Sequence, residues 1–327
     1  MNRQSEDAPG LLDRIGRAIE SEASPGAGND PLQRAAYELD RARMLAGLLG
    51  PQDWSGLDKV FIISTGRTGT KFLARFLNQF REVYATHEPY PDFLPMAIDY
   101  ARGRVAEDVA VERMMRLRRA LRRQVARRGA RIYVESNNRL FSLMAPLRRA
   151  FGRFKVVHIV RDGRDYVRSG MSRVWYTERD RAPRLRASYF PEDPCFADWE
   201  RMSRFEKICW RWQKKDGFIQ AGLAALDDHI SLKFEDIFKD PEHAGMRRML
   251  DYIGLPADAS ERVLARMMDR KVNSTRSHAI PKWTQWDRGL IDSFERIAGA
   301  HMRRCYDYDW QGNPVAELQT NRAPARN

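Results

Sequence analysis

The chain has 327 residues, of which 43% are hydrophobic and 10% aromatic, enough to build a large folded core. Its formal net charge of +13 favours anionic ligands or partners. No window approaches the roughly 18 apolar residues of a membrane-spanning helix, which speaks against a transmembrane protein. The three cysteines form no CxxC pair, which speaks against a disulfide scaffold. We therefore expect a cytoplasmic protein with free thiols.

The first 57 residues differ in character from the rest of the chain. Residues 21–30 (SEASPGAGND) have the composition of a linker. Residues 31–49 carry apolar side chains at helical spacing and predict an amphipathic helix. We expect 1–57 to be a helical extension with a flexible linker, 58–312 to be the main domain, and 313–327 to be a polar tail. Whether the extension docks on the core stays open.

Residues 60–80 (VFIISTGRTGTKFLARFLNQF) predict a strand, a small-residue loop and a helix. This geometry points backbone N–H groups and a helix N-terminus at an anion, so a nucleotide phosphate is the expected ligand. The loop departs from the ATP-binding P-loop, because Lys71 is not preceded by glycine and Phe72 replaces the metal-binding hydroxyl. Arg67 lies inside the loop, where a guanidinium suits an oxyanion.

Two further runs predict strands with polar ends. Val83 to Ala85 precede His87 and Glu88, and either side chain is a candidate general base at the same sheet edge as the loop. Residues 132–138 (IYVESNN) predict a third strand with a polar end. Two interpretations of this end stay open: Glu135, Ser136 and Asn137 reach the acceptor site, or Asn138 only caps the next helix.

Between these two strands, Arg113 to Arg131 holds nine arginines and no acidic residue. Interleaved apolar residues predict a helix with one charged face. Four interpretations stay open: a solvated face, a contact to an acidic acceptor, a contact to an anionic membrane surface, or nucleic-acid binding. The chain carries no nucleic-acid-binding module motif, so we expect no nucleic-acid partner.

Residues 155–173 (KVVHIVRDGRDYVRSGMSR) predict another buried strand with Arg161 at its end. Asp162 is suited to cap the following helix, and Asp165 and Ser169 share one face of it. Ligands of open α/β sheets bind at the carboxyl ends of strands, so Arg67 and Arg161 are expected at one edge.

The two motifs together resemble those of the sulfotransferases that use 3′-phosphoadenosine 5′-phosphosulfate (PAPS). GRTGT at 66–70 looks like the family's 5′-phosphosulfate loop, Lys/Arg-Ser-Gly-Thr-Thr, with Arg67 at the basic position and Thr68, Gly69 and Thr70 at the next three. Lys71 replaces the second threonine. RDGRDYVRS at 161–169 looks like the family's 3′-phosphate motif, in which Arg161 and Ser169 match the two phosphate ligands.

Two weaker likenesses occur later in the chain. ISLKFED at 230–236 resembles the late family strand that ends in Tyr/Phe-Glu-Asp, and PKW at 281–283 resembles the region that closes over the cofactor. The resemblance covers about residues 58–310 and implies this set of cofactor-binding residues: Gly66, Arg67, Thr68, Gly69, Thr70, Lys71, Arg161, Ser169, Arg276, Lys282 and Trp283.

The resemblance also implies a fold and a reaction. The fold is a P-loop-like three-layer α/β domain with a central, mainly parallel sheet of about five strands flanked by helices. The reaction moves the sulfuryl group of PAPS to a hydroxyl or amine without a metal, and Arg67 stabilises the leaving group. Tyrosylprotein- and heparan-type members use a glutamate as base where this chain has Glu88, and His87 is its competitor. The acceptor, whether small molecule, saccharide or peptide, is not specified.

Two other functions remain open on the sequence. One is a P-loop-type kinase that uses Mg-ATP or Mg-GTP, against which the imperfect loop and the Arg-plus-eight-Ser motif argue. The other is a basic, non-catalytic protein that keeps the nucleotide site, against which intact Arg67 and Glu88 argue.

Overall fold

The computed structural model of the chain describes residues 54–267, 279–306 and 308, together with isolated positions between 35 and 46. The predicted N-terminal extension and polar tail lie almost entirely outside these residues, as does Arg276. In the part of the chain that the structure describes, no helix is long and apolar enough to cross a membrane.

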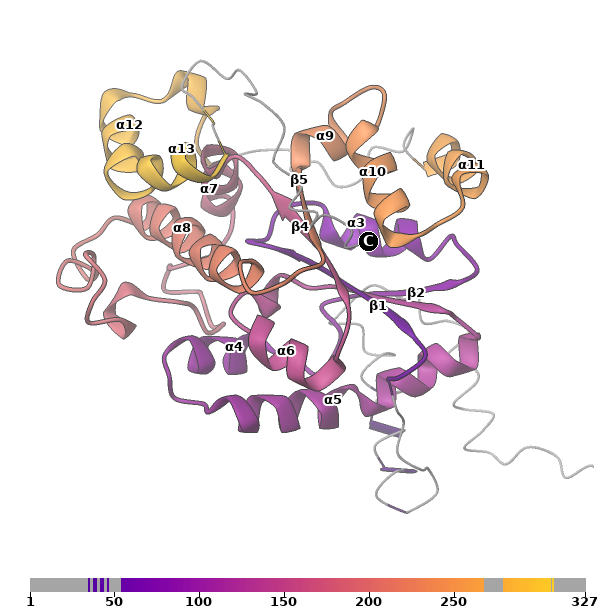
Figure 1. The fold of residues 1–327 in the computed structure, drawn as a ribbon. Coiled ribbons are helices and arrows are strands. Elements are labelled where there is room, and N and C mark those ends of the chain that lie inside the picture. Colours follow the sequence, from indigo (N-terminus) through magenta and orange to yellow (C-terminus); the bar gives the residue numbers. More distant parts are fainter. Residues whose placement is uncertain are drawn as a thin grey trace, which may run out of the picture.

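Five strands form one sheet in which every neighbouring pair is parallel (Figure 1). The strands are β1 (Asp58–Ser64), β2 (Val83–His87), β3 (Ile132–Ser136), β4 (Lys155–Val160) and β5 (His229–Lys233), in the spatial order β2-β3-β1-β4-β5. The prediction of a P-loop-like α/β fold with about five mainly parallel strands is therefore confirmed.

Helices cover both faces of the sheet and leave β1 buried along almost its whole length. Its side chains alternate between two cores: Val60 and Ile62 join one, and Phe61 and Ile63 join the other. Burial on both faces explains why β1 reads as an uninterrupted apolar run.

The two cores are built by different helices. One core takes its helical residues from α3 (Thr70–Leu77), α9 (Phe234–Phe238), α10 (Ala244–Ile253) and α11 (Ala257–Met267). The other takes them mainly from α4 (Leu94–Ala101), α5 (Glu107–Arg128), α6 (Met144–Phe151), α7 (Gly163–Met171), α8 (Arg204–Leu223), α12 (Arg288–Phe294) and α13 (Ala300–Tyr306).

The predicted late strand 230–236 is too long at its carboxyl end. The strand ends at Lys233, and α9 begins directly at Phe234. The ring centroids of Phe234 and Phe238 lie 4.8 Å apart, one helical turn from each other, so aromatic packing favours a helix where the sequence was read as extended.

The arginine-rich segment forms the greater part of α5, as predicted, but its arginines do not all lie on the charged face. Arg118 is completely buried and makes two hydrogen bonds to the Glu135 carboxylate, at 3.0 and 2.8 Å. Glu135 also accepts hydrogen bonds from Tyr133 (2.7 Å) and Asn137 (2.8 Å). The Glu135 carboxylate is therefore buried and occupied by these donors, which contradicts the interpretation in which Glu135 reaches the acceptor site.

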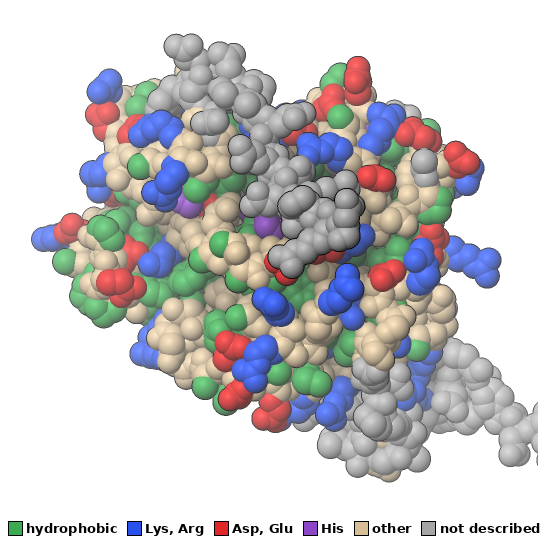
Figure 2. Space-filling view, in the orientation of Figure 1, with side chains coloured by type: hydrophobic (Ala, Val, Ile, Leu, Met, Phe, Trp, Pro, Cys, Tyr) green, Lys and Arg blue, Asp and Glu red, His purple; other side chains and the backbone are tan. Residues whose placement is uncertain are grey.

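The basic residues on the surface are not gathered in one field on the face shown in Figure 2. Lysine and arginine side chains are scattered there among acidic ones. On this face the positive net charge is therefore spread out, and no continuous basic stripe marks a polyanion track.

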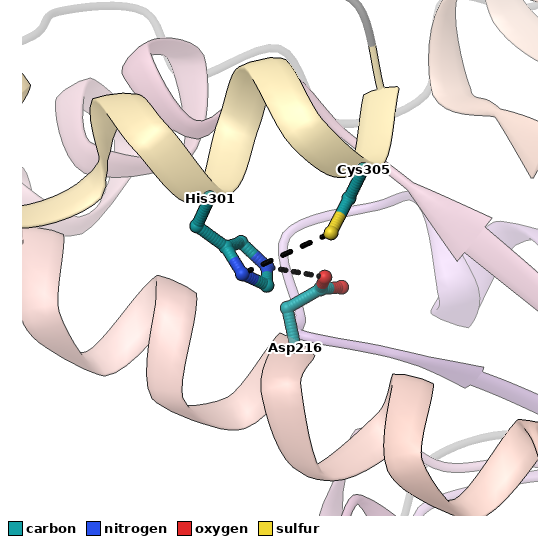
Figure 3. A group of neighbouring side chains, drawn as sticks. All are labelled: Asp216, His301 and Cys305. Carbon is teal, nitrogen blue, oxygen red and sulfur yellow. Dashed lines mark hydrogen bonds and ion pairs between the residues drawn. The ribbon is translucent and has the colours of Figure 1, made fainter.

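A second buried polar cluster joins α8 to α13 (Figure 3). The Asp216 carboxylate receives hydrogen bonds from His301 Nε2 (2.8 Å) and from the Tyr306 hydroxyl, and lies 3.5 Å from His158 Nε2. Cys305 Sγ lies 3.9 Å from the other ring nitrogen of His301. Among the described residues, Asp216, His301 and Cys305 have the make-up of a metal-ligand group. Protein donors already occupy Asp216, so the cluster is satisfied without an ion.

Burial and hydrogen bonding act in opposite directions in this cluster. Burial would lower the pKa of His301, but the hydrogen bond to Asp216 outweighs it and raises that pKa to about 9. Burial would raise the pKa of Asp216, but the nearby His158 and the hydrogen bonds from His301 and Tyr306 lower it to about 2. At neutral pH the cluster therefore holds an imidazolium–carboxylate pair.

The Arg118–Glu135 pair yields a stability prediction. Arg118→Met leaves a buried carboxylate without its partner and should lower the free energy of unfolding by about 3–5 kcal/mol. The matched control is Arg119→Met, because Arg119 is the exposed neighbour on α5, and it should change stability by less than about 0.5 kcal/mol. Urea unfolding measures both, and equal effects would contradict the role given to the pair.

The His301–Asp216 pair yields a pH prediction. Because the pKa of His301 is raised from 6.5 to about 9, its contribution to stability is complete below about pH 6.5 and is lost as the pH rises through about 9. His301→Gln should therefore cost more stability at about pH 6 than at about pH 10. His229→Gln, at a half-buried histidine outside the cluster, is the control. A His301→Gln cost that does not change with pH in urea unfolding would contradict the ion pair.

Candidate active site

The loop between β1 and α3 is tightly folded and leaves the start of the helix without a side-chain cap. Gly66, Arg67 and Gly69 all have positive φ, at 103°, 63° and 70°. The Ser64 hydroxyl fixes the turn by accepting from Gly66 N (3.1 Å) and from the Thr68 hydroxyl (2.8 Å). Gly69 precedes α3 and offers no cap, so the first N–H groups of the helix remain available to an anion.

Glycine is required at position 69 for a second reason. A Cβ built there would lie 2.5 Å from Cζ of Phe238, a side chain of α9. The loop therefore lies so close to α9 that no residue with a side chain fits at position 69.

Arg67 joins the two motifs that the sequence singled out. Its Nε donates to the Ser169 hydroxyl at 2.9 Å, and its carbonyl accepts from Arg161 Nη1. Burial, followed by the neighbouring charges of Arg173 and Arg161, lowers the pKa of Arg67 to about 10. The structure thus brings Arg67, Arg161 and Ser169 together.

Arg161 directly follows β4, and two neighbouring side chains hold its guanidinium in place. Its guanidinium stacks on the Phe234 ring at 4.6 Å, and Nη2 lies 3.9 Å from Asp165. Its Nε is buried and has no hydrogen-bond partner among the described residues. A buried guanidinium nitrogen without a partner is a donor that an anion in this site would satisfy. Asp162 caps α7 as predicted, accepting from Arg164 N at 2.8 Å.

Glu88 follows β2 directly, and its backbone N–H donates to Ser136 O at 3.0 Å. Its carboxylate accepts a hydrogen bond from Asn138 Nδ2 and forms an ion pair with Arg139 Nη2 at 2.8 Å. Arg139 also pairs with Asp92 at 2.7 Å. The Glu88 carboxylate is therefore oriented from two sides.

His87, the competing base, is the last residue of β2. Burial lowers the pKa of its imidazole, and Nδ1 lies 3.1 Å from the carbonyl oxygen of Ser136. With the proton on Nδ1, the ring would donate to this carbonyl and present Nε2 as the acceptor.

The segment at 279–286 lies against the 3′-phosphate-type motif on α7. Arg168 Nε donates to Ile280 O at 3.4 Å, and Ala279 N donates to the Ser172 hydroxyl at 3.2 Å. The Arg164 guanidinium stacks on the Trp283 ring at 3.7 Å, so one face of this indole is already occupied. Lys282 is exposed.

Arg139 and Lys215 are neighbours of this site that the sequence interpretation missed, and it offered Asn138 only as a helix cap. Lys215 lies on α8, is 1% exposed, and donates to Thr65 O (3.0 Å) and to both oxygens of Asn138. Its signal in the sequence is weak, since a lysine within the helix that contains Trp210 and Trp212 reads as a solvated position.

One comparison with known proteins identifies a family. The model of the sulfotransferase family matches residues 59–259. Similar solved structures include a sulfotransferase from Mycobacterium avium (11% identity, TM-score 0.49, covering 95% of this chain and 100% of that one). A sulfotransferase from Alicyclobacillus acidocaldarius (14% identity, TM-score 0.40, covering 74% and 96%) is also similar. No curated protein matches. Since the family match spans more than half of its length, the chain belongs to the sulfotransferase family.

Proposed function

We propose that the protein transfers the sulfuryl group of PAPS to a hydroxyl or amine of an acceptor, with Glu88 as general base. The observation that carries the proposal is the contact of the two motifs at Arg67, whose side chain meets Ser169 and whose carbonyl meets Arg161. A donor with phosphates at both its 3′ and 5′ positions needs two anion sites side by side.

The residues present suit this donor. The uncapped start of α3 and the backbone amides of 68–71 would hold the sulfonate and 5′-phosphate oxygens. Arg161, with its buried and unpartnered Nε, and Ser169 would hold the 3′-phosphate. Lys282 and Trp283 follow a segment that contacts α7. Following the family resemblance, we assign Lys282 and Arg276 to phosphate contacts and Trp283 to stacking on adenine.

The chemistry needs one proton transfer and one displacement. The acceptor oxygen or nitrogen attacks sulfur and forms the new bond, while its proton passes to the Glu88 carboxylate. The bond from sulfur to the bridging oxygen breaks, and its electron pair leaves with 3′,5′-adenosine bisphosphate. Arg67 and the loop amides stabilise the charge that develops on this leaving group.

Transfer in this way requires positioning rather than a covalent intermediate or a metal. The sulfuryl group carries less charge than a phosphoryl group, so fixed arginines suffice where phosphoryl transfer uses Mg²⁺. The acceptor is a small molecule, saccharide or peptide whose reactive group reaches Glu88.

The first test is calorimetric titration of adenosine 3′,5′-bisphosphate without Mg²⁺. We expect micromolar binding that Arg161→Ala and Ser169→Ala each weaken about tenfold or more, because each removes a phosphate contact. Arg153→Ala is the control, since Arg153 is exposed near the amino end of β4, away from the loop edge. Absence of binding by folded protein, with binding of Mg-ATP instead, would favour the kinase alternative.

The second test separates the base from the binding site. Glu88→Gln should reduce the release of 3′,5′-adenosine bisphosphate from PAPS by about 100- to 10,000-fold while nucleotide affinity stays within about twofold. Single-turnover assays with a panel of phenols, sugars and amines measure the rate, and calorimetry measures the affinity.

His87→Gln is the matched variant for this test. A loss of rate in His87→Gln but not in Glu88→Gln would transfer the role of base to the histidine. Binding without turnover by the wild-type protein, across the panel and with water, would support the non-catalytic alternative.

A further inference from the structure

Lys215 is a buried lysine beside the candidate site, although it lies on α8 and belongs to neither motif. Its Nζ donates to Thr65 O (3.0 Å), Asn138 O (2.9 Å) and Asn138 Oδ1 (3.0 Å). An ammonium group has three N–H donors, and here each has an acceptor. Thr65 immediately precedes the phosphate-type loop, so one side chain fixes the entry to that loop.

The position is costly for a lysine. Burial, followed by the charge of Arg211, lowers the pKa of Lys215 well below its ordinary value, whereas Glu88 acts in the opposite direction. An apolar side chain of similar length would fill the same volume without this desolvation cost. It would also leave the carbonyl oxygens of Thr65 and Asn138 without the donor that Lys215 supplies, so these contacts are what holds a lysine here.

Asn138 connects Lys215 to Glu88. Its Oδ1 accepts from Lys215, and its Nδ2 donates to the Glu88 carboxylate. The amide is thereby fixed in one orientation, because a flipped amide would place Nδ2 against the ammonium and Oδ1 against the carboxylate. Asn138 also packs on the loop, since a Cβ at Gly66 would lie 3.4 Å from Asn138 Cγ.

We propose that Lys215 is a positioning residue that couples the phosphate-type loop to the general base, holding Thr65 directly and Glu88 through Asn138. This inference rests on the proposed function, because the alignment of the sulfuryl donor with the general base matters only if the protein catalyses the transfer. In-line transfer requires the sulfur and the acceptor proton to be placed together, and a single cation that fixes both sides keeps their separation constant.

The coupling has two arms, the direct contact of Lys215 with the loop and its contact with Glu88 through Asn138. Removing one arm or both should have different effects. Lys215→Met frees both the loop and Asn138, so we expect nucleotide affinity to fall about tenfold and single-turnover release to fall about 100-fold. Asn138→Ala removes the hydrogen bond to Glu88 but leaves the bonds of Lys215 to the Thr65 and Asn138 carbonyls, so release should fall about tenfold while affinity stays within about twofold of wild type. A residue with a purely structural role would not separate affinity from rate in this way.

The control is Lys214→Met, at the preceding position of the same helix. Lys214 pairs with Asp193 at 3.0 Å and has no part in the proposed site. We expect wild-type nucleotide affinity and release rate in this variant. Equal affinity and rate in Lys215→Met and Lys214→Met would overturn the proposal.

Amide hydrogen exchange tests the same coupling without any ligand. In Lys215→Met, exchange should accelerate at least about tenfold both at residues 66–70 and at Glu88, whose N–H donates to Ser136 O. In Asn138→Ala the acceleration should be confined to the segment around Glu88. Unchanged exchange at both segments in Lys215→Met, or an unchanged release rate in Asn138→Ala, would overturn the coupling.

Failure of the coupling is distinguishable from failure of the proposed function. A wild-type protein that binds no 3′,5′-adenosine bisphosphate contradicts the function, and with it the catalytic meaning of the coupling. If the wild-type protein binds the nucleotide and releases it from PAPS, but Lys215→Met behaves like Lys214→Met, only the coupling is contradicted. If Lys215→Met does not fold, the split between affinity and rate in Asn138→Ala decides.

Discussion

The parallel pairing of β1 with β4 is the constraint on which the candidate site depends. Ser64, the last residue of β1, lies opposite Ile159, one residue before the end of β4. The loop after β1 and the turn after β4 therefore begin side by side, although their sequences are far apart. The contact from Arg161 to the Arg67 carbonyl is a direct consequence of this register. A slip of one residue would turn the side chains of β4 to the opposite faces and separate the motifs.

This arrangement concentrates cations that repel one another. Arg173 and Arg161 both lower the pKa of Arg67, and the buried ammonium of Lys215 is disfavoured by Arg211. Such repulsion reduces the stability of the ligand-free protein. The polyanionic donor that we propose would relieve this repulsion, and the relief would contribute to its binding energy. Preorganised charge of this kind stabilises a leaving group better than charge that must first assemble.

The sequence predicts the parts of the fold that depend on local pattern. Apolar runs gave β1 and β4, and the small-residue loop after β1 was recognised because its backbone requires glycine at positions such as Gly69. It does not predict partners that meet only in three dimensions. Arg118 reads as one of nine arginines on a helix, yet its partner Glu135 lies on β3. Lys215 and Asn138 likewise have no local signal, because their roles arise from contacts 77 residues apart.

Backbone strain distinguishes two of the candidate residues from the rest. In the described part of the chain, Arg67, Glu88, Tyr176 and His243 are the non-glycine residues with positive φ. Such conformations cost about 1–3 kcal/mol each and persist only where neighbours enforce them. At Arg67 the neighbour is Arg161, which donates to its carbonyl, and at Glu88 it is Ser136, whose carbonyl accepts the Glu88 N–H. Two of these four strained positions thus belong to the proposed donor loop and the proposed base. Glycine would adopt these φ values without strain, so the side chains at Arg67 and Glu88 are kept at a conformational cost that the roles proposed for them would explain.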